Sequence, residues 1–288
     1  MSRSSTSQKH HNGVVNFANP IADPDVAFAL DIAHATGTLL ANRPDSLDVD
    51  SKSTPTDVVT HMDRLAEDLL VSRITSERPL DGILGEEGAD VESQSGRMWV
   101  IDPLDGTVNY LYQLPFWAVS VGLLDVESGT GLVGVVYAPA LGKAWIASRG
   151  AGAYELSAST HRKLVVSECA TLDRALMGTG FGYSTQRRAS QGRVIRTVLP
   201  EVRDIRRMGS CAIDLCLVAE GALDGYFERG VNPWDHAAGS LIAREAGAQV
   251  SGLRGSVEGS EMLVAANPQI HASLVARLET LNADSDEE

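Results

Sequence analysis

The sequence predicts an α/β protein whose helices and sheets pack in layers. The first observation is a series of short strand-like segments between Ile83 and Leu156, separated by Gly, Ser and Pro turns. The second is an alternation of strand-like and helix-like segments in the rest of the chain, which is typical of layered α/β packing. The third is the composition, with 43% hydrophobic residues, 27 glycines and 11 prolines in 288 residues. A chain of this size can form one large domain or two closely packed halves.

The N-terminal part is predicted to hold two helices joined by an extended segment, Lys52–Asp63, that passes through Pro55. The first helix runs from about Pro24 to Asn42, because Asp23 can cap it and proline suits its first turn. The second runs from Asp63 to Ser76. Side chains expected to face the core share helical spacing: Val26, Leu30, Ala33, Gly37 and Leu40 in the first helix, and Leu65, Leu69 and Ile74 in the second.

The remaining elements follow from period and turn residues. The strands expected in the first half are Trp99–Asp102, Ala118–Leu124, Gly131–Tyr137, Lys143–Ala147 and Ala153–Leu156. The strands expected in the second half are Lys163–Ser167, Leu176–Gly178, Asp224–Glu228 and Met262–Ala266. The helices expected between and after them are Gln186–Val202, Cys211–Ala222, Pro233–Ala246 and Pro268–Leu281. A boundary at Ser157–Arg162 separates the two halves.

Composition limits the function. A formal net charge of −14 makes nucleic acid unlikely as the main ligand, although a bound metal could reverse the charge locally for a small anion. No apolar run reaches the ~20 residues that span a bilayer, and the polar first twenty residues are not a secretory signal. Three cysteines without paired spacing indicate a reducing cytoplasm and small buried side chains; they are Cys169, Cys211 and Cys216.

One segment departs from the acidic balance. Seven arginines lie within 21 residues: Arg187, Arg188, Arg193, Arg196, Arg203, Arg206 and Arg207. They form either a solvated helix face or subunit contact, or a patch that binds RNA or phosphate. Glu201 and Asp204 dilute the run and favour the first interpretation.

The segment Trp99–Thr107 is the most informative part of the chain. It is predicted to be a short buried strand that ends in two aspartates, Asp102 and Asp105, before a Gly-Thr turn. Buried like charges repel each other and lose hydration unless a cation compensates them. The spacing of three residues across a proline can aim both carboxylates at one point. Turn chemistry explains Asp105, but it does not explain Asp102.

Other acidic residues also lie at structural breaks. Glu86 and Glu87 follow a predicted strand, whereas Asp63 and Asp235 stand at helix starts. Oxygen-only ligands suit magnesium, and the chain has no zinc-type spacing of His and Cys. Asp63 and Asp235 would equally suit the positive end of a helix dipole. Glu87 is interpreted as a solvated neighbour of Glu86 or as a group behind the ligands.

The Gly106-Thr107 step predicts an anion site. Glycine lets the backbone approach a ligand, and a helix that begins near Thr107 would direct free N–H groups at a phosphate. The Thr107 hydroxyl could orient a water or simply cap the helix. No nucleophile elbow or Walker loop is present, and Gly178–Gly182 lacks the dinucleotide spacing.

Four segments closely resemble the inositol monophosphatase family of metal-dependent sugar-phosphate phosphatases. They are Lys52–Asp63, Ile83–Glu87, Trp99–Asn109 with its Asp-Pro-Leu-Asp-Gly-Thr run, and Val231–Gly247. With the connecting pattern, the resemblance spans about residues 24–280. It implies a layered α/β/α/β/α sandwich, usually dimeric, and therefore a homodimer.

The resemblance implies a site with two to three Mg²⁺ ions. The implied ligands of the first ion are Glu86, Asp102 and the backbone carbonyl of Leu104. Those of the second are Asp102, Asp105 and Asp235, whereas Asp63 and Glu86 would help to hold a third ion through water. The chain accordingly divides into a disordered tail over 1–22, a half over 23–157 with most ligands, a half over 158–282 with Asp235 and substrate contacts, and an acidic tail over 283–288.

The implied catalytic residues are Glu86, Thr107 and Asp63, the first two orienting the attacking water. The implied phosphate contacts are the amides of Gly106 and Thr107. Substrate contacts are implied for Asp105, Asp235, Gly209, Ser210, Cys211 and Glu228, and Cys211 stands where the family more usually has alanine.

The implied function is Mg²⁺-dependent hydrolysis of the small anionic ester inositol 1-phosphate to inositol and phosphate in the cytoplasm. Histidinol phosphate, a nucleotide 3′-phosphate and fructose 1,6-bisphosphate remain alternative substrates, although Asn109 and Ala118–Leu123 favour the inositol branch. A non-catalytic regulator that binds RNA or protein is the alternative of another class. Because every implied ligand position is filled, the enzyme interpretation is favoured.

Overall fold

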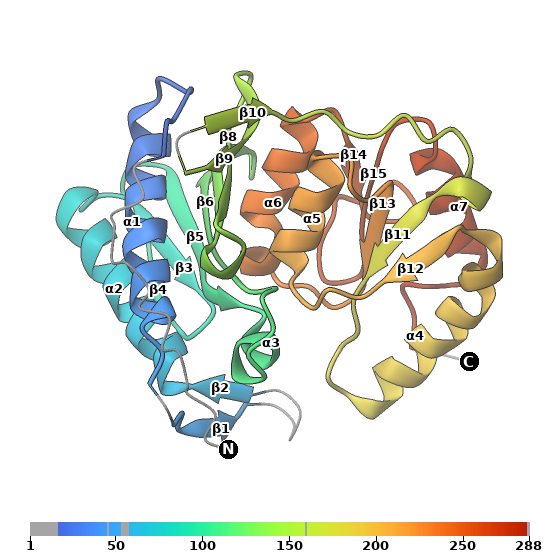
Figure 1. Cartoon of the computed structure of the whole chain (residues 1–288), viewed down its shortest axis with the longest axis horizontal. Helices are drawn as coiled ribbons and strands as arrows, with labels where there is room; N and C mark the ends of the chain where they lie inside the picture. Colours follow the sequence, from blue (N-terminus) through green and yellow to red (C-terminus); the bar gives the residue numbers. More distant parts are fainter. Residues whose placement is uncertain (1–16, 45, 53–57, 159, 287–288) are drawn as a thin grey trace, which may run out of the picture.

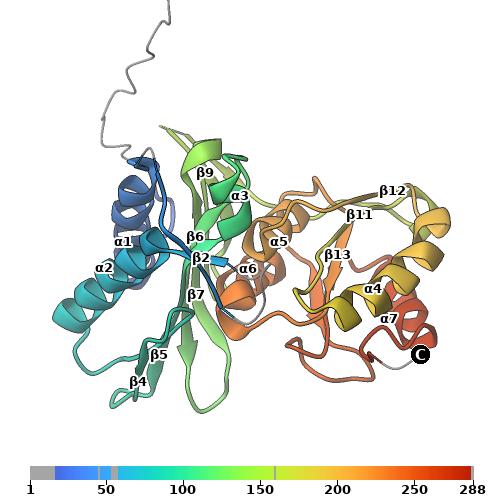
Figure 2. The same ribbon diagram turned by 90° about the horizontal axis from the view of Figure 1, so that it is seen from below.

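The computed structural model describes residues 17–44, 46–52, 58–158 and 160–286, which form five layers (Figures 1 and 2). From one side to the other they are the helices α1 (Pro24–Ala41) and α2 (His61–Glu77), an eight-stranded sheet, the helices α5 (Cys211–Ala219) and α6 (Pro233–Glu245), a five-stranded sheet, and the helices α4 (Thr185–Val198) and α7 (His271–Thr280). The predicted α/β/α/β/α sandwich is confirmed.

The eight-stranded sheet has the order β10-β9-β8-β7-β6-β5-β3-β4. Its strands are β3 (Gly82–Gly85), β4 (Asp90–Val91), β5 (Arg97–Asp105), β6 (Ala118–Asp125), β7 (Gly131–Ala138), β8 (Lys143–Ser148), β9 (Gly152–Ser157) and β10 (Thr160–Lys163). All neighbours are antiparallel except β3 and β5, which run parallel with Gly85 opposite Ile101. The residues that follow Gly85 and Ile101 therefore emerge at the same edge of the sheet, and they are Glu86 and Asp102.

The five-stranded sheet has the order β12-β11-β13-β15-β14. Its strands are β11 (Leu176–Thr179), β12 (Asp204–Arg206), β13 (Gly225–Glu228), β14 (Gln249–Ser251) and β15 (Leu263–Ala266). A separate antiparallel pair consists of β1 (Val49–Ser51) and β2 (Val58–Thr60). The short helices are α3 (Thr107–Leu111), η1 (Pro139–Leu141), η2 (Leu172–Arg174) and η3 (Leu199–Glu201).

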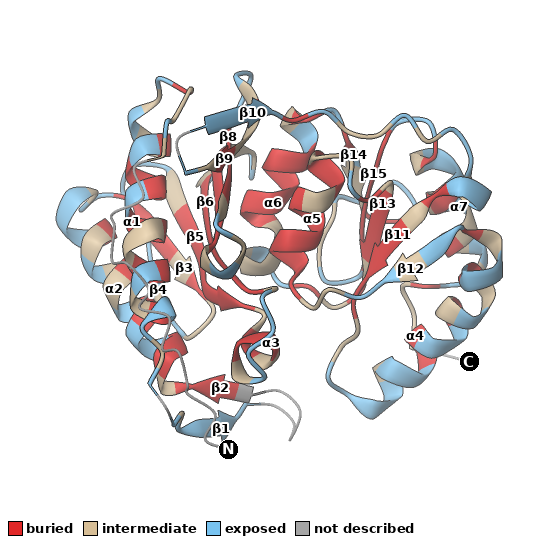
Figure 3. Ribbon diagram, viewed as in Figure 1, coloured by how far each residue is buried: buried red, intermediate tan, exposed pale blue. Residues whose placement is uncertain are grey.

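The central helices α5 and α6 are buried on most sides because a sheet covers each face of this layer (Figure 3). Gly134 of β7 permits the close approach of α6, since a Cβ there would lie 2.6 Å from the carbonyl oxygen of Ala238. This contact fixes α6 against the first sheet. The N-terminal turn of α6, which carries Asp235, is held at the edge where β5 ends.

The helix predictions at the N-terminal end are confirmed in position, but the inward face of the second helix is wrong in part. Asp23 caps α1 by accepting a hydrogen bond from the N–H of Asp25 at 2.9 Å. In α2, Leu65 is 48% exposed and Leu69 is half-buried. The inward position predicted for Ile74 is confirmed, and it belongs to a buried apolar stripe with Met62, Ala66 and Leu70. The helix begins at His61, two residues earlier than predicted.

Other boundaries also differ from the predictions. The helix predicted to reach Ala222 ends at Ala219, and the helix predicted from Pro268 begins at His271. The strand predicted at Lys163–Ser167 instead ends at Lys163 as β10, still in the first sheet. The helix predicted to reach Val202 ends at Val198, because Pro200 follows. The predicted extended segment Lys52–Asp63 forms part of the β1–β2 pair and α2, and its residues 53–57 lie outside the described residues. The division into two halves near Ser157 stays a prediction.

Parts of the predicted tails lie within the described residues, and the disorder of the tails stays a prediction. Phe17 packs edge-on against His34 and Tyr137, and Asp284 forms an ion pair with Arg254. The remainder of the predicted tails, residues 1–16 and 287–288, lies outside the described residues. The three cysteines are free thiols, and Cys211 and Cys216 are buried as predicted. Within the described ranges, every helix is too short or too polar to cross a bilayer.

Candidate active site

Acidic side chains from separate segments line one cavity of about 520 Å³ between the two sheets. Glu86 comes from the end of β3, Asp102 and Asp105 from β5, Glu228 from β13 and Asp235 from α6. Leu104, Gly106, Thr107, Gly209 and Cys211 also line the cavity. Two predicted site residues, Asp63 and Ser210, lie behind the wall and contact residues that line it.

Asp102 is almost completely buried, with 1% of its surface exposed. Its Oδ1 accepts a hydrogen bond from the backbone N–H of Leu104 at 2.9 Å. Burial, followed by the charges of Glu86, Asp105 and Asp235, raises the pKa of Asp102 well above the ordinary value. The fold therefore places a carboxylate where its charge is poorly compensated by the protein alone.

Asp105 joins the first sheet to α5. Its Oδ2 accepts hydrogen bonds from the Ser210 hydroxyl at 2.6 Å and from the N–H of Ala212 at 2.7 Å. Burial still raises the pKa of Asp105 to about 7, although these two hydrogen bonds act against the rise. Asp105 thus has a structural role in addition to its place in the cavity wall.

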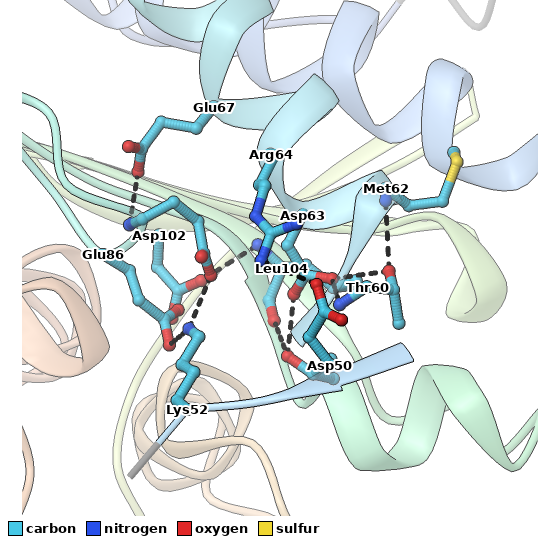
Figure 4. A network of polar contacts seen from close by, with 12 residues as sticks. Asp50, Lys52, Thr60, Met62, Asp63, Arg64, Glu67, Glu86, Asp102 and Leu104 are labelled. Carbon is cyan, nitrogen blue, oxygen red and sulfur yellow. Dashed lines mark hydrogen bonds and ion pairs between the residues drawn. The ribbon is translucent and has the colours of Figure 1, made fainter. Parts of the chain in front are cut away.

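Asp63 supports Thr107 from behind the cavity. The Thr107 hydroxyl lies 2.9 Å from Asp63 Oδ1 and 3.2 Å from the carbonyl oxygen of Leu104. Asp63 Oδ2 accepts hydrogen bonds from the N–H and the hydroxyl of Thr60, which caps α2 (Figure 4). Asp63 is therefore a helix-capping residue that also orients the Thr107 hydroxyl. Burial is the main reason that the pKa of Asp63 is raised.

Asp235 lies in the first turn of α6, where its Oδ2 accepts a hydrogen bond from the N–H of Asn232 at 2.6 Å. Burial, and then the charges of Asp105 and Glu86, raise the pKa of Asp235 well above its usual range. Asp235 thus caps the start of α6, as its position in the sequence allowed, and it also lines the acidic cavity. The helix-start role is therefore confirmed, and the role as a metal ligand stays a prediction.

Lys52 extends from the end of β1 toward the carboxylates (Figure 4). Its Nζ lies 2.9 Å from Glu86 Oε1 and 2.6 Å from Glu87 Oε1. The Glu87 side chain is only 7% exposed, so the prediction of a solvated neighbour is wrong. Burial raises the pKa of Glu87 to about 7. The Lys52 ammonium group therefore occupies a position beside the cavity carboxylates that attracts a cation.

The donor chemistry of the cavity fits magnesium. Carboxylate oxygens and a backbone carbonyl are the ligand types that Mg²⁺ takes in proteins, and divalent charge would relieve the repulsion that raises the pKa values. In the described part of the chain, no three His, Cys, Asp or Glu side chains already form a closed ligand set. The cavity carboxylates thus suit magnesium in chemical type and in burial. Because Lys52 is paired with Glu86, these side chains must rearrange before they can bind an ion.

The Gly106 turn brings backbone groups close together. Gly106 has φ of 91°, and a Cβ there would lie 2.7 Å from the carbonyl oxygen of Phe116. Asn109 is buried, and its amide donates to the carbonyls of Phe116 and Met208. Asn109 therefore shapes the turn rather than contacting substrate, which removes its weight in the choice of substrate branch.

Comparison with known proteins connects this geometry to a family. Residues 22–283 match the model of the inositol monophosphatase family. The chain belongs to the inositol monophosphatase family. It is therefore similar to phosphatases that act on phosphate esters and are generally metal-dependent.

Relatives of this family member carry two kinds of name. An inositol-1-monophosphatase of Mycobacterium leprae is 46% identical over 241 residues, which cover 81% of this chain and 82% of the relative. The Nus factor SuhB of Escherichia coli K12 is 35% identical over 268 residues, with 88% and 96% covered. The crystal structure of extragenic suppressor protein SuhB of Bartonella henselae matches with a TM-score of 0.82 and 31% identity, covering 89% of this chain and 99% of that one.

Sequence reasoning missed Glu67, which holds the loop that carries Glu86 in this inositol monophosphatase family member. Glu67 lies on α2, and one of its carboxylate oxygens accepts the N–H of Glu87 at 2.8 Å (Figure 4). Its other carboxylate oxygen accepts the N–H of Ala89 at 2.9 Å. A glutamate beside the exposed Asp68 is typical of a solvated helix face, so only tertiary packing identifies it.

Glu67→Ala is expected to lower catalytic efficiency by about 10- to 100-fold, the range found when a group that supports metal ligands is removed. The two N–H groups lose their acceptor, and the loop with Glu86 becomes less fixed. Phosphate release titrated with Mg²⁺ should show a higher half-saturating concentration. Glu67→Gln, which retains one acceptor oxygen, should recover part of the loss, and Asp68→Ala is the exposed control. An unchanged magnesium titration in Glu67→Ala would contradict this positioning role.

Proposed function

We propose that this phosphatase hydrolyses inositol 1-phosphate to inositol and phosphate with two to three Mg²⁺ ions. The observation that carries the proposal is the meeting of Glu86, Asp102, Asp105 and Asp235 in one cavity wall beside the Gly106 turn. The resemblance to the inositol-1-monophosphatase of M. leprae supports the choice of substrate.

The proposed ligands are those implied by the sequence motifs. They are Glu86, Asp102 and the Leu104 carbonyl for one ion, and Asp102, Asp105 and Asp235 for the other. A third ion would be held through water near Asp63 and Glu86. Lys52 would have to leave Glu86 for these contacts to form. When bound, magnesium supplies charge stabilisation and makes water more acidic.

The chain's own residues would position the reactants. The Thr107 hydroxyl, whose proton is directed to Asp63, keeps lone pairs that can accept a hydrogen bond from the attacking water and so orient it. Glu86 would accept from the same water on the cavity side. The amides of Gly106 and Thr107 would bind phosphate oxygens, because the first N–H groups of a helix have no partner within it. Positioning and charge stabilisation are the main requirements of phosphoryl transfer.

The sugar-side contacts would come from the second half of the chain. Glu228 accepts a hydrogen bond from the Tyr226 hydroxyl, and burial raises the pKa of the Glu228 carboxyl. Its carboxylate would accept a hydroxyl of the polyol. Gly209 and Cys211 would line the same end, with Ser210 fixed behind them by Asp105.

The test is a phosphate-release assay with purified protein and Mg²⁺. It compares inositol 1-phosphate with histidinol phosphate, adenosine 3′,5′-bisphosphate and fructose 1,6-bisphosphate. We expect the fastest release from inositol 1-phosphate, loss of release in EDTA and recovery on adding Mg²⁺. A preference for histidinol phosphate would overturn the substrate and leave the chemistry intact. Equal release in EDTA would overturn the metal dependence.

We also propose that the enzyme is a cytoplasmic homodimer. The free thiols suit a reducing compartment. Tyr112 and Leu114, beside α3, are 73% and 50% exposed in the single chain, and a second subunit would cover such apolar side chains. Light scattering of the purified protein would show twice the chain mass.

A second candidate function is binding of RNA or protein, favoured only by the relative named Nus factor SuhB. The arginine run gives it little support, because Arg206 pairs with Asp204 and Arg203 donates to the carbonyl of Arg174. Absence of RNA binding at low salt would exclude the RNA role.

A further inference from the structure

We propose that the cavity contains a second anion site, formed by Arg187 and Arg207, for an additional phosphate on the substrate. This inference rests on the proposed phosphatase function and narrows its substrate class to small polyol or sugar esters that gain affinity from a second phosphate. Arg187 lies on α4 and Arg207 follows β12, and both line the cavity. These two elements belong to the half of the molecule built around the five-stranded sheet, whereas β3 and β5 belong to the other half (Figure 1).

Arg187 is held against two glycines that line the same cavity. A Cβ at Gly182 would lie 2.8 Å from its Cδ, and a Cβ at Gly230 would lie 2.5 Å from its Nη1. Side chains at either position would displace the guanidinium. Its Nη2 lies 3.4 Å from Asp286, and its buried Nε has no partner among the described residues. The guanidinium is thus fixed in place and retains donors for a ligand.

Arg207 is placed in a similar way. A Cβ at Gly209 would lie 2.4 Å from its Nη1, so the guanidinium crosses the glycine next to the Gly106 turn. In the described part of the chain its side chain has no hydrogen bond or ion pair. Arg207 acts electrostatically on Glu228, since its charge opposes the effect of burial on the pKa of that carboxyl. Arg207 therefore faces the sugar end of the cavity.

The charges of the cavity leave room for a second anion. Bound Mg²⁺ would balance the acidic wall and the phosphate being released, whereas the two guanidinium groups lie on the other side. The cavity carboxylate on that side, Glu228, is already bonded to the Tyr226 hydroxyl. Guanidinium groups bind phosphate through two parallel hydrogen bonds. A volume of about 520 Å³ is sufficient for a polyol with two phosphates.

The experiment uses two substrate pairs that differ only in the second phosphate. They are inositol 1-phosphate with inositol 1,4-bisphosphate, and fructose 1-phosphate with fructose 1,6-bisphosphate. In the Mg²⁺-loaded protein, we expect a higher kcat/KM for each bisphosphate, arising mainly from a lower KM. Arg207→Ala and Arg187→Ala should each reduce the ratio of the two kcat/KM values at least tenfold. Arg206→Ala should preserve the ratio, because Arg206 is paired with Asp204 and does not line the cavity.

Two outcomes would overturn the second anion site. Equal losses on both members of a pair would show that the arginines hold the phosphate being released, and an unchanged ratio would show that they bind neither. Lack of release from every substrate would instead refute the proposed function. Calorimetric binding of the same four ligands would then still measure the effect of the second phosphate. Arg187→Lys retains the positive charge beside Asp286 but lacks the paired N–H donors of a guanidinium. A reduced ratio in this variant would therefore come from the lost phosphate contact and not from loss of folding.

Discussion

Asp102→Asn is expected to reduce Mg²⁺-dependent phosphate release by about three orders of magnitude or more, an effect as large as removal of a central charge-stabilising group. Asp102 is the proposed shared ligand, and a neutral amide cannot replace its charge. The amide oxygen can still accept the hydrogen bond from the N–H of Leu104. The local backbone should therefore remain as it is.

The same substitution should leave the metal-free protein as stable as the wild type or more stable. Burial and three neighbouring carboxylates raise the pKa of Asp102, so the folded state favours its protonated form. As the pH rises above the ordinary pKa of an aspartate, the unfolded chain loses this proton more readily than the folded protein does. The free energy of unfolding therefore falls. Asparagine removes this loss of stability at neutral pH. Thermal unfolding in EDTA measures it.

Magnesium provides the matched measurement. It should raise the melting temperature of the wild type and raise that of Asp102→Asn much less, because a ligand that binds only the folded state stabilises it. Asp90→Asn, an exposed carboxylate on β4, is the control for loss of charge alone. Normal Mg²⁺-dependent turnover in Asp102→Asn would refute its role as the shared ligand.

The sequence predicts the central part of the site because its residues carry their signal locally. Two aspartates that end an apolar strand have few ordinary explanations, and Asp-Gly-Thr marks the turn. The capping signal at Asp23 likewise places α1 within one residue of its observed bounds. Local chemistry is sufficient in these cases, since the deciding partners are neighbours in sequence.

Local patterns do not explain partners that are distant in sequence. The parallel pairing of β3 with β5 passes over β4, so no hairpin signal places Glu86 beside Asp102, and only the family resemblance implies that they meet. Lys52 reaches Glu86 across 34 positions, and Glu67 reaches Glu87 across 20. The apolar residues of α2 fit more than one helical phase, and tertiary packing selects the one that exposes Leu65.

Asp105→Ala is expected to lose both activity and stability, in contrast to Asp102→Asn. The proposed metal contact disappears, and phosphate release should fall about a hundredfold or more. The buried Ser210 hydroxyl and the N–H of Ala212 also lose their shared acceptor. Two unsatisfied buried donors cost about 2–4 kcal/mol of the free energy of unfolding. Urea unfolding at pH 4 in EDTA measures this loss. Burial raises the pKa of Asp105 to about 7, so at pH 4 the folded protein keeps this carboxyl protonated, and little charge penalty remains to offset the lost hydrogen bonds.

The comparison with Ser210→Ala separates the two hydrogen bonds. That variant removes the hydroxyl and keeps the contact between Asp105 and the N–H of Ala212, so its loss should be about 1 kcal/mol. Asp105 thus connects the end of β5 to the start of α5, and a substitution that tests its proposed metal role also loosens that connection. If Asp105→Ala unfolded at the same urea concentration as Asp102→Asn, the stabilising connection between the sheet and α5 would have to lie elsewhere.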